Sequence, residues 1–128
     1  MEDLIERVST AAGIEPEVAR KAIGIILSFL QKEGPADEVG KVMDAVPGSR
    51  EAASSAAGEA PESSGFLGGL MGGGGGLMGL ASQLTGIGLG MGEMQTVGRE
   101  IFAFAREKVG EDTVGQIAGA IPGLSALT

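Results

Sequence analysis

The sequence predicts an all-α protein, a helical bundle made of two pseudo-symmetric helix–helix–helix repeats that a Gly-rich linker joins. Three observations predict this class. Apolar residues recur at the three- and four-residue spacing of a helix face rather than in alternation. Glycines and Pro-Gly pairs interrupt these apolar runs where helices would end. The chain also matches itself at an offset of 75 positions.

The internal match defines the expected organisation. Residues 13–48 align without a gap on residues 88–123, and nine of the 36 pairs are identical. The shared string reads DEVGKVMDAVPG in the first copy and DTVGQIAGAIPG in the second, so we infer a duplication. We expect an N-terminal helical repeat over 1–50, a low-complexity Ala/Ser/Gly linker over 51–76, and a C-terminal repeat over 77–128 packed on the first.

The first two helices of the N-terminal repeat follow from local signals. Leu4 and Val8 fall on one side of a helix over about 2–12, where Asp3 and Arg7 are spaced for an i,i+4 ion pair. The second helix begins near Pro16, because proline fits the first turn of a helix, and it breaks at Gly34-Pro35. Its apolar stripe is wide enough for a central helix and comprises Val18, Ala22, Ile23, Ile26, Leu27, Phe29 and Leu30.

The third helix and the whole second repeat follow the same pattern. We expect Asp37 and Asp112 to act as structural helix caps, because a carboxylate can accept hydrogen bonds from the first free N–H groups. Pro47-Gly48 ends the third helix. The long helix of the second repeat is expected over about 92–108, and Leu77, Leu80, Ala81 and Leu84 keep helical spacing before it. The inward residues are expected to be Val39, Val42, Val46, Met94, Val97, Ile101 and Phe104.

Composition excludes several classes of function. The chain has no Cys and no His, so the commonest metal ligands and the commonest general base are missing. Asp37 and Asp112 are the only acidic residues that repeat, and capping accounts for both better than a catalytic pair does. We therefore expect no catalytic residue, no metal, no cofactor and no enzymatic activity.

Charge bears on partners and location. The formal net charge of −8 opposes nucleic-acid binding, which depends on cations that neutralise phosphates. The first residues, MEDLIERVS, carry Glu2 and Asp3 where a secretion signal carries positive charge. We expect a cytoplasmic protein that binds no nucleic acid.

The glycine-rich segment is long enough to span a bilayer but poorly suited to it. Residues 63–92 contain no charge over 30 positions, yet 13 of them are Gly, and a glycine run leaves backbone groups that lipid cannot satisfy. Gly74, Gly76 and Gly79 match the G-x-G-x-x-G phosphate-loop pattern. No apolar strand precedes them, so nucleotide binding is not expected.

The apolar residues of this segment form the candidate interaction surface. They either fold back over the bundle or meet the same residues of another copy, since a large apolar patch is costly in water. We predict a non-enzymatic protein-interaction or self-association module, a homo-oligomer, with peripheral membrane association as the alternative. The surface comprises Phe66, Leu67, Leu70, Met71, Leu77 and Met78.

The two DxVG…PG strings and the opening EDLIERVSTAAGIEPEVARKAIGIILSFLQKEG resemble small helical bacterial proteins classified as domains of unknown function. In those proteins an ERV-like first helix, a Gly-hydrophobic turn, an amphipathic helix and an A-x-x-Pro-Gly stop recur. The resemblance covers residues 1–48 and 88–123. It implies a helical fold and brings no activity, cofactor or catalytic residue.

Overall fold

The computed structural model describes residues 2–59 and 76–121, with side chains described over 2–54 and 80–121. Every regular element within these ranges is a helix, which confirms the all-α class. The elements are α1 (Glu2–Ala12), α2 (Pro16–Glu33), α3 (Ala36–Ala45), α4 (Ser49–Glu59), α6 (Gly76–Gly86), α7 (Met91–Val109) and α8 (Glu111–Ala120).

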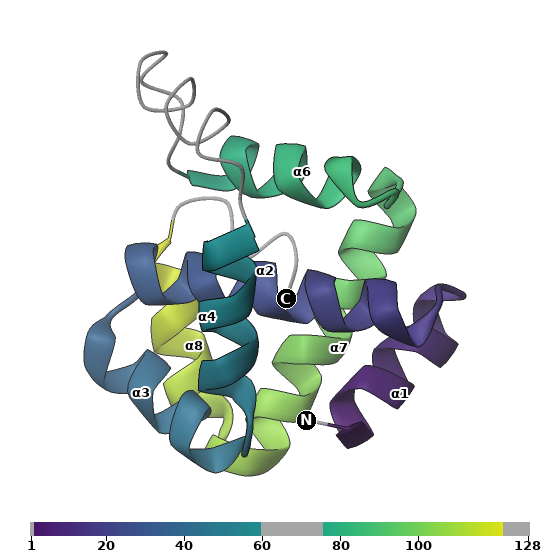
Figure 1. The fold of residues 1–128 in the computed structure, drawn as a ribbon. Coiled ribbons are helices and arrows are strands. Elements are labelled where there is room, and N and C mark those ends of the chain that lie inside the picture. Colours follow the sequence, from purple (N-terminus) through teal and green to yellow (C-terminus); the bar gives the residue numbers. More distant parts are fainter. Residues whose placement is uncertain (1, 60–75, 122–128) are drawn as a thin grey trace.

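Helix α2 runs through the middle of the molecule (Figure 1). It contacts α1, α3, α4, α6 and α7, and its closest packing is with α4. Six consecutive residues, 22–27, are buried, as expected for a helix that is covered on more than one side. The wide apolar stripe therefore correctly predicted a central helix.

One apolar core joins the two halves of the chain, residues 2–59 and 76–121. It takes side chains from all the described helices, and nearly all of the predicted inward residues belong to it. The largest fully buried side chain, Phe102, is 1% exposed and was not among the predicted ones. The predicted residues that are buried include Leu4, Val8, Ala22, Ile23, Ile26, Leu27, Phe29, Leu30, Val39, Val42, Val46, Val97, Ile101 and Phe104.

Helix α4 corrects the expected boundary between the first repeat and the linker. Residues 49–59, most of which were assigned to the linker, form a helix that packs along α2. Ala52 and Ala53 are buried, and Ser49, which is also buried, donates a hydrogen bond from its hydroxyl to the carbonyl of Met43 at 2.9 Å. Alanine has the highest helix propensity, and its small side chain lets two helices approach closely. An Ala/Ser-rich stretch was thus mistaken for a spacer.

The predicted capping role of the two repeated aspartates is wrong. Helix α3 begins at Ala36 after Pro35, and α8 begins at Glu111 after Gly110, so each aspartate is the second residue of its helix. Neither helix has a side-chain capping hydrogen bond. Asp37 and Asp112 still lie in the first turn, where a negative charge is favourable beside the helix N-terminus.

Candidate functional site

Most of the predicted interaction surface lies outside the described residues. This is the case for Phe66, Leu67, Leu70 and Met71. Leu77 and Met78 belong to the first turn of α6, but their side chains lie outside the described residues as well. The structure therefore does not bring these six residues together or separate them.

The described charged cluster that joins elements distant in sequence is the Arg7 clamp, formed by Arg7, Glu100 and Glu107. The Nε of Arg7 on α1 donates to Oε2 of Glu100 on α7 at 2.7 Å. Its Nη1 donates to Oε2 of Glu107, about two turns further along α7, at 2.5 Å. One guanidinium thus holds two carboxylates of the other half of the chain.

Local helix geometry explains why these three side chains meet. Leu4 and Val8 of α1 are buried, and this places Arg7 at the edge of the buried face, where α1 contacts α7. Glu100 and Glu107 are seven residues apart, about two helical turns, and so lie on the same side of α7. Each residue sits beside the apolar contact between the two helices.

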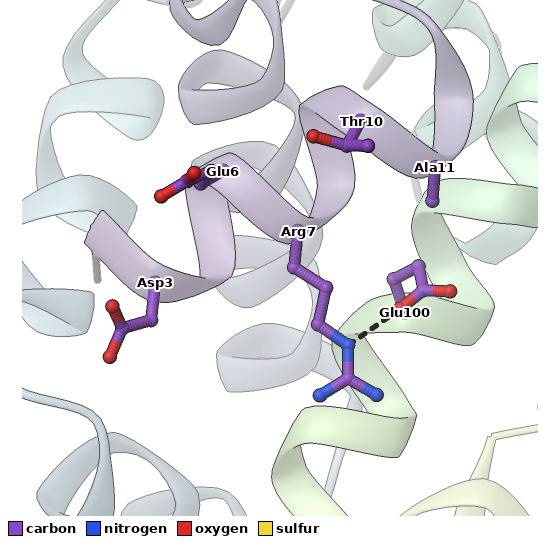
Figure 2. A pocket seen from close by; sticks show the side chains of 6 residues that line it. All are labelled: Asp3, Glu6, Arg7, Thr10, Ala11 and Glu100. Carbon is purple, nitrogen blue, oxygen red and sulfur yellow. Dashed lines mark hydrogen bonds and ion pairs between the residues drawn. The ribbon is translucent and has the colours of Figure 1, made fainter.

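A shallow depression opens beside the clamp, lined by Asp3, Glu6, Arg7, Thr10, Ala11 and Glu100. Figure 2 shows the Arg7 side chain leaving α1 toward Glu100 on α7, whereas Asp3 and Glu6 point away from it. The depression therefore has one cation, which is already paired, and unpaired acidic side chains at its rim.

The electrostatics of the depression limit its chemistry. Hydrogen bonds from Arg7 to Glu107 and then to Glu100 raise the pKa of the guanidinium above its ordinary value. An arginine is protonated at any ordinary pH, so this group can neither accept nor release a proton. Because two carboxylates already neutralise it, the clamp is suited to holding α1 on α7 rather than to binding an anion.

Two further findings concern the part of the chain that the structure describes. No three carboxylates there lie close enough to hold a metal ion. No helix there is long and apolar enough to cross a bilayer.

The sequence predicted the wrong partner for Arg7. The expected ion pair with Asp3 is absent among the described contacts, and Arg7 instead pairs with residues 93 and 100 positions away. An i,i+4 spacing is visible in one helix, whereas a contact between two helices depends on how they pack. No local signal could have identified Glu100 and Glu107.

No protein-family model, curated protein or solved structure matches this chain. The resemblance to uncharacterised helical bacterial proteins therefore remains an expectation from the sequence.

Proposed function

We propose that this protein is a non-enzymatic, cytoplasmic module that binds protein, and in particular other copies of itself, through its apolar glycine-rich segment. The observation that carries the proposal is the charge-free stretch over residues 63–92, in a chain of which 20% is charged. Six large apolar residues lie between positions 66 and 78 of this stretch. Apolar patches of this kind typically mark interaction sites on soluble proteins.

Helix α6, which belongs to the later part of this charge-free stretch, differs from the apolar residues before it. In α6 the side chains of Leu80 and Leu84 are buried, and α6 packs on α2, while Ser82, Gln83 and Thr85 face solvent. This end of the stretch has an apolar side covered by the bundle and a polar side in water. We propose that the apolar residues before it, Phe66 to Met71, are covered by another copy.

We propose further that the two halves are pseudo-symmetric repeats joined by the glycine-rich segment. Support comes from the element bounds, since α3 and α8 begin and end 75 positions apart, and α2 and α7 begin 75 positions apart. Gly13 and Gly88, which are also 75 positions apart, both have positive φ, at 68° and 97°. Superposing residues 13–46 on residues 88–121 in a crystal structure tests this proposal. A close superposition would support it, and two different arrangements of the helices would contradict it.

Light scattering coupled to gel filtration tests the self-association. We expect a mass above the 12.7 kDa of one chain, rising with protein concentration. A variant with Phe66→Ser, Leu67→Ser, Leu70→Ser and Met71→Ser keeps the chain length and removes apolar area, so it should require a higher concentration to associate.

A matched control places substitutions in the neighbouring polar residues. Ser63→Ala and Ser64→Ala change the same region without removing a large apolar side chain and should leave the measured mass unchanged. If the unaltered protein has the mass of one chain at every concentration, the proposed self-association is wrong.

The alternative use of the same residues is insertion into a membrane surface. Large apolar side chains without flanking charge can enter the boundary between headgroups and acyl chains. Co-sedimentation with neutral and with anionic vesicles separates the two functions. Pelleting that the four serine substitutions abolish would favour the membrane surface over a second copy.

A further inference from the structure

The sulfur chemistry of this chain belongs to methionine alone. Sulfur side chains are common targets of oxidants in proteins, and the chain has six Met and no Cys. No thiol therefore competes with the methionines for an oxidant. Which methionine reacts first depends on how well solvent reaches its sulfur.

The methionines that the structure describes differ widely in exposure. Met91 is 76% exposed, and among the described side chains it is the large hydrophobic one that is well exposed. Met43, by contrast, is 4% exposed and belongs to the core. Met94 is half-buried and packs against the core. The fold therefore keeps one thioether in water and shields another. The side chains outside the described residues are those of Met1, Met71 and Met78.

The backbone around Met91 fixes its exposure. Met91 is the first residue of α7. Just before it, Leu89 is buried, and its N–H donates a hydrogen bond to the carbonyl of Leu84 at 3.1 Å. Just after it, Glu93 accepts a hydrogen bond from the N–H of Gly90 at 3.2 Å. Because the chain is held on both sides of Met91, the folded protein presents this side chain to solvent.

Packing gives no reason for an apolar residue at this position. The matching position at the start of α2, 75 residues earlier, is Pro16, which is exposed as well. The first residue of either long helix thus lies outside the core. At such a position, methionine differs from other side chains chiefly by its oxidisable sulfur.

We propose that Met91 is a reversible oxidation site, at which hydrogen peroxide forms methionine sulfoxide while the protein stays folded. A lone pair of the sulfur attacks one peroxide oxygen, the O–O bond breaks, and water leaves after proton transfer. The sulfur loses two electrons and the peroxide gains them. A dithiol, acting through methionine sulfoxide reductases, restores the thioether and leaves water and a disulfide. The inference is independent of the proposed self-association.

Exposure also decides what the added oxygen does to the fold. At Met91 the sulfoxide oxygen would lie in water, where it is solvated at no cost to packing. At Met43 the same oxygen would be buried without a partner, and a buried polar group without a hydrogen bond is costly. The core methionine is therefore expected to react only when the protein opens.

Peptide mapping after brief treatment with dilute hydrogen peroxide tests the proposal on the full chain, folded and in urea. Trypsin releases Met43 in residues 42–50, and a glutamate-specific protease releases Met91 in residues 63–93. Fragment ions of residues 79–93 contain Met91 and neither Met71 nor Met78. We expect Met91 to be oxidised at nearly the same rate in both states, and Met43 at least about 100-fold more slowly in the folded protein. A Met91 that the fold protects as strongly as Met43 would overturn the proposal.

Reversibility has its own measurement. Incubation of the oxidised protein with both epimer-specific methionine sulfoxide reductases and dithiothreitol should remove the oxygen from Met91 without prior unfolding. An oxygen that persists until urea is added would mean that the site is not reversible in the folded protein.

A pair of glutamine substitutions tests whether the fold accepts a polar group at each position. Glutamine has a similar length and places an amide near the position of the sulfoxide oxygen. The urea midpoint of Met91→Gln should equal that of the unaltered protein, whereas the matched Met43→Gln should unfold at a clearly lower urea concentration. A midpoint for Met91→Gln as low as that for Met43→Gln would contradict oxidation without unfolding.

Discussion

The two long helices, α2 and α7, start 75 positions apart and have nearly equal length, yet they are buried to different depths. Residues 22–27 of α2 are all buried, whereas in the corresponding stretch of α7 Arg99 is exposed and Glu100 is half-buried. The shared positions Ile26 and Ile101 are both 2% exposed. The helices therefore share one apolar face and differ on the other.

The difference follows from what covers each helix. Helix α4 packs closely along α2, and Ile25 is buried at the position where α7 carries Glu100. On α7 that face receives α1 at its edge, and Glu100 accepts a hydrogen bond from Arg7 at 2.7 Å. Helices α2 and α7 thus share a helical pattern, but α2 is a central helix and α7 is half-exposed.

The largest expected effect comes from giving α2 the residue of α7. Ile25→Glu places a carboxylate without a partner in the core, and a buried unpaired charge costs several kcal/mol, about 3 or more. Urea denaturation followed by circular dichroism should show a protein that is largely unfolded or much less stable. The reverse change, Glu100→Ile, should alter stability by less than about 1 kcal/mol. If both substitutions changed stability equally, the face of α2 that carries Ile25 and the face of α7 that carries Glu100 would not differ in burial.

A second prediction concerns the face that the helices share. Ile26→Ala and Ile101→Ala each remove the same atoms from positions of equal burial, so each should lower the unfolding free energy by about 2–5 kcal/mol. Because the two side chains are equally buried and belong to one shared core, we expect the two values to agree within about 1 kcal/mol, well inside the spread seen for such substitutions. Paired urea titrations measure both. A difference of several kcal/mol would show that the shared face is not equivalent in the two halves.

A smaller effect is expected where α2 ends. A Cβ at Gly34 would lie 2.7 Å from the Leu30 carbonyl oxygen and 2.9 Å from Val39, whereas α7 carries Val109 at the matching position. Gly34→Ala should therefore destabilise the protein by about 1–3 kcal/mol. The control is Gly40→Ala in α3, where a Cβ meets nothing within 4 Å, so alanine should stabilise the helix by about 0.5–1 kcal/mol. Thermal melts that show the same sign for both would contradict the tight contact at Gly34.

The smallest effect is expected at the Arg7 clamp. Its side chains are partly exposed, 37% for Arg7 and 61% for Glu107, and exposed ion pairs contribute roughly 0–1 kcal/mol. Arg7→Gln should lower stability by less than about 1 kcal/mol at low salt, and by less still in about 1 M salt. A loss above about 2 kcal/mol would mean that the clamp is more than a surface pair.

The pH dependence of this contribution follows from the raised pKa of Arg7. A group whose pKa is higher in the folded state contributes fully below its unfolded pKa and loses the contribution as pH rises through the folded value. For arginine this window lies above about pH 12. Arg7 titration should therefore leave the stability difference between wild type and Arg7→Gln unchanged from pH 7 to pH 10, as urea titrations at both values would measure.

Local patterns predicted the helices well. The first helix was expected over 2–12 and is observed over Glu2–Ala12, and the second long helix was expected over about 92–108 and is observed over Met91–Val109. Apolar periodicity and the Gly and Pro stops are properties of residues close together in the sequence, and these residues determine where a helix forms and ends. The prediction failed at α4, where alanine and serine suit a spacer and a packed helix equally.

The described site was less predictable than the fold. The Arg7 clamp joins residues 93 and 100 positions apart, and no spacing rule connects them. The aspartate caps were placed at the right turns, but the helices begin before Asp37 and Asp112. Helix starts depend on backbone geometry within one or two residues, which composition does not specify.

The sequence by itself determined the helical class, the position of most helices and the apolar face of each, because these depend on residues within a few turns of one another. Only the tertiary structure decided that α4 covers α2, that α1 crosses to α7 and that Arg7 meets two glutamates there. Those choices depend on the shapes of surfaces formed by distant residues. The free energy of burying such surfaces is gained only when two helices pack together, so it cannot be inferred from either helix alone.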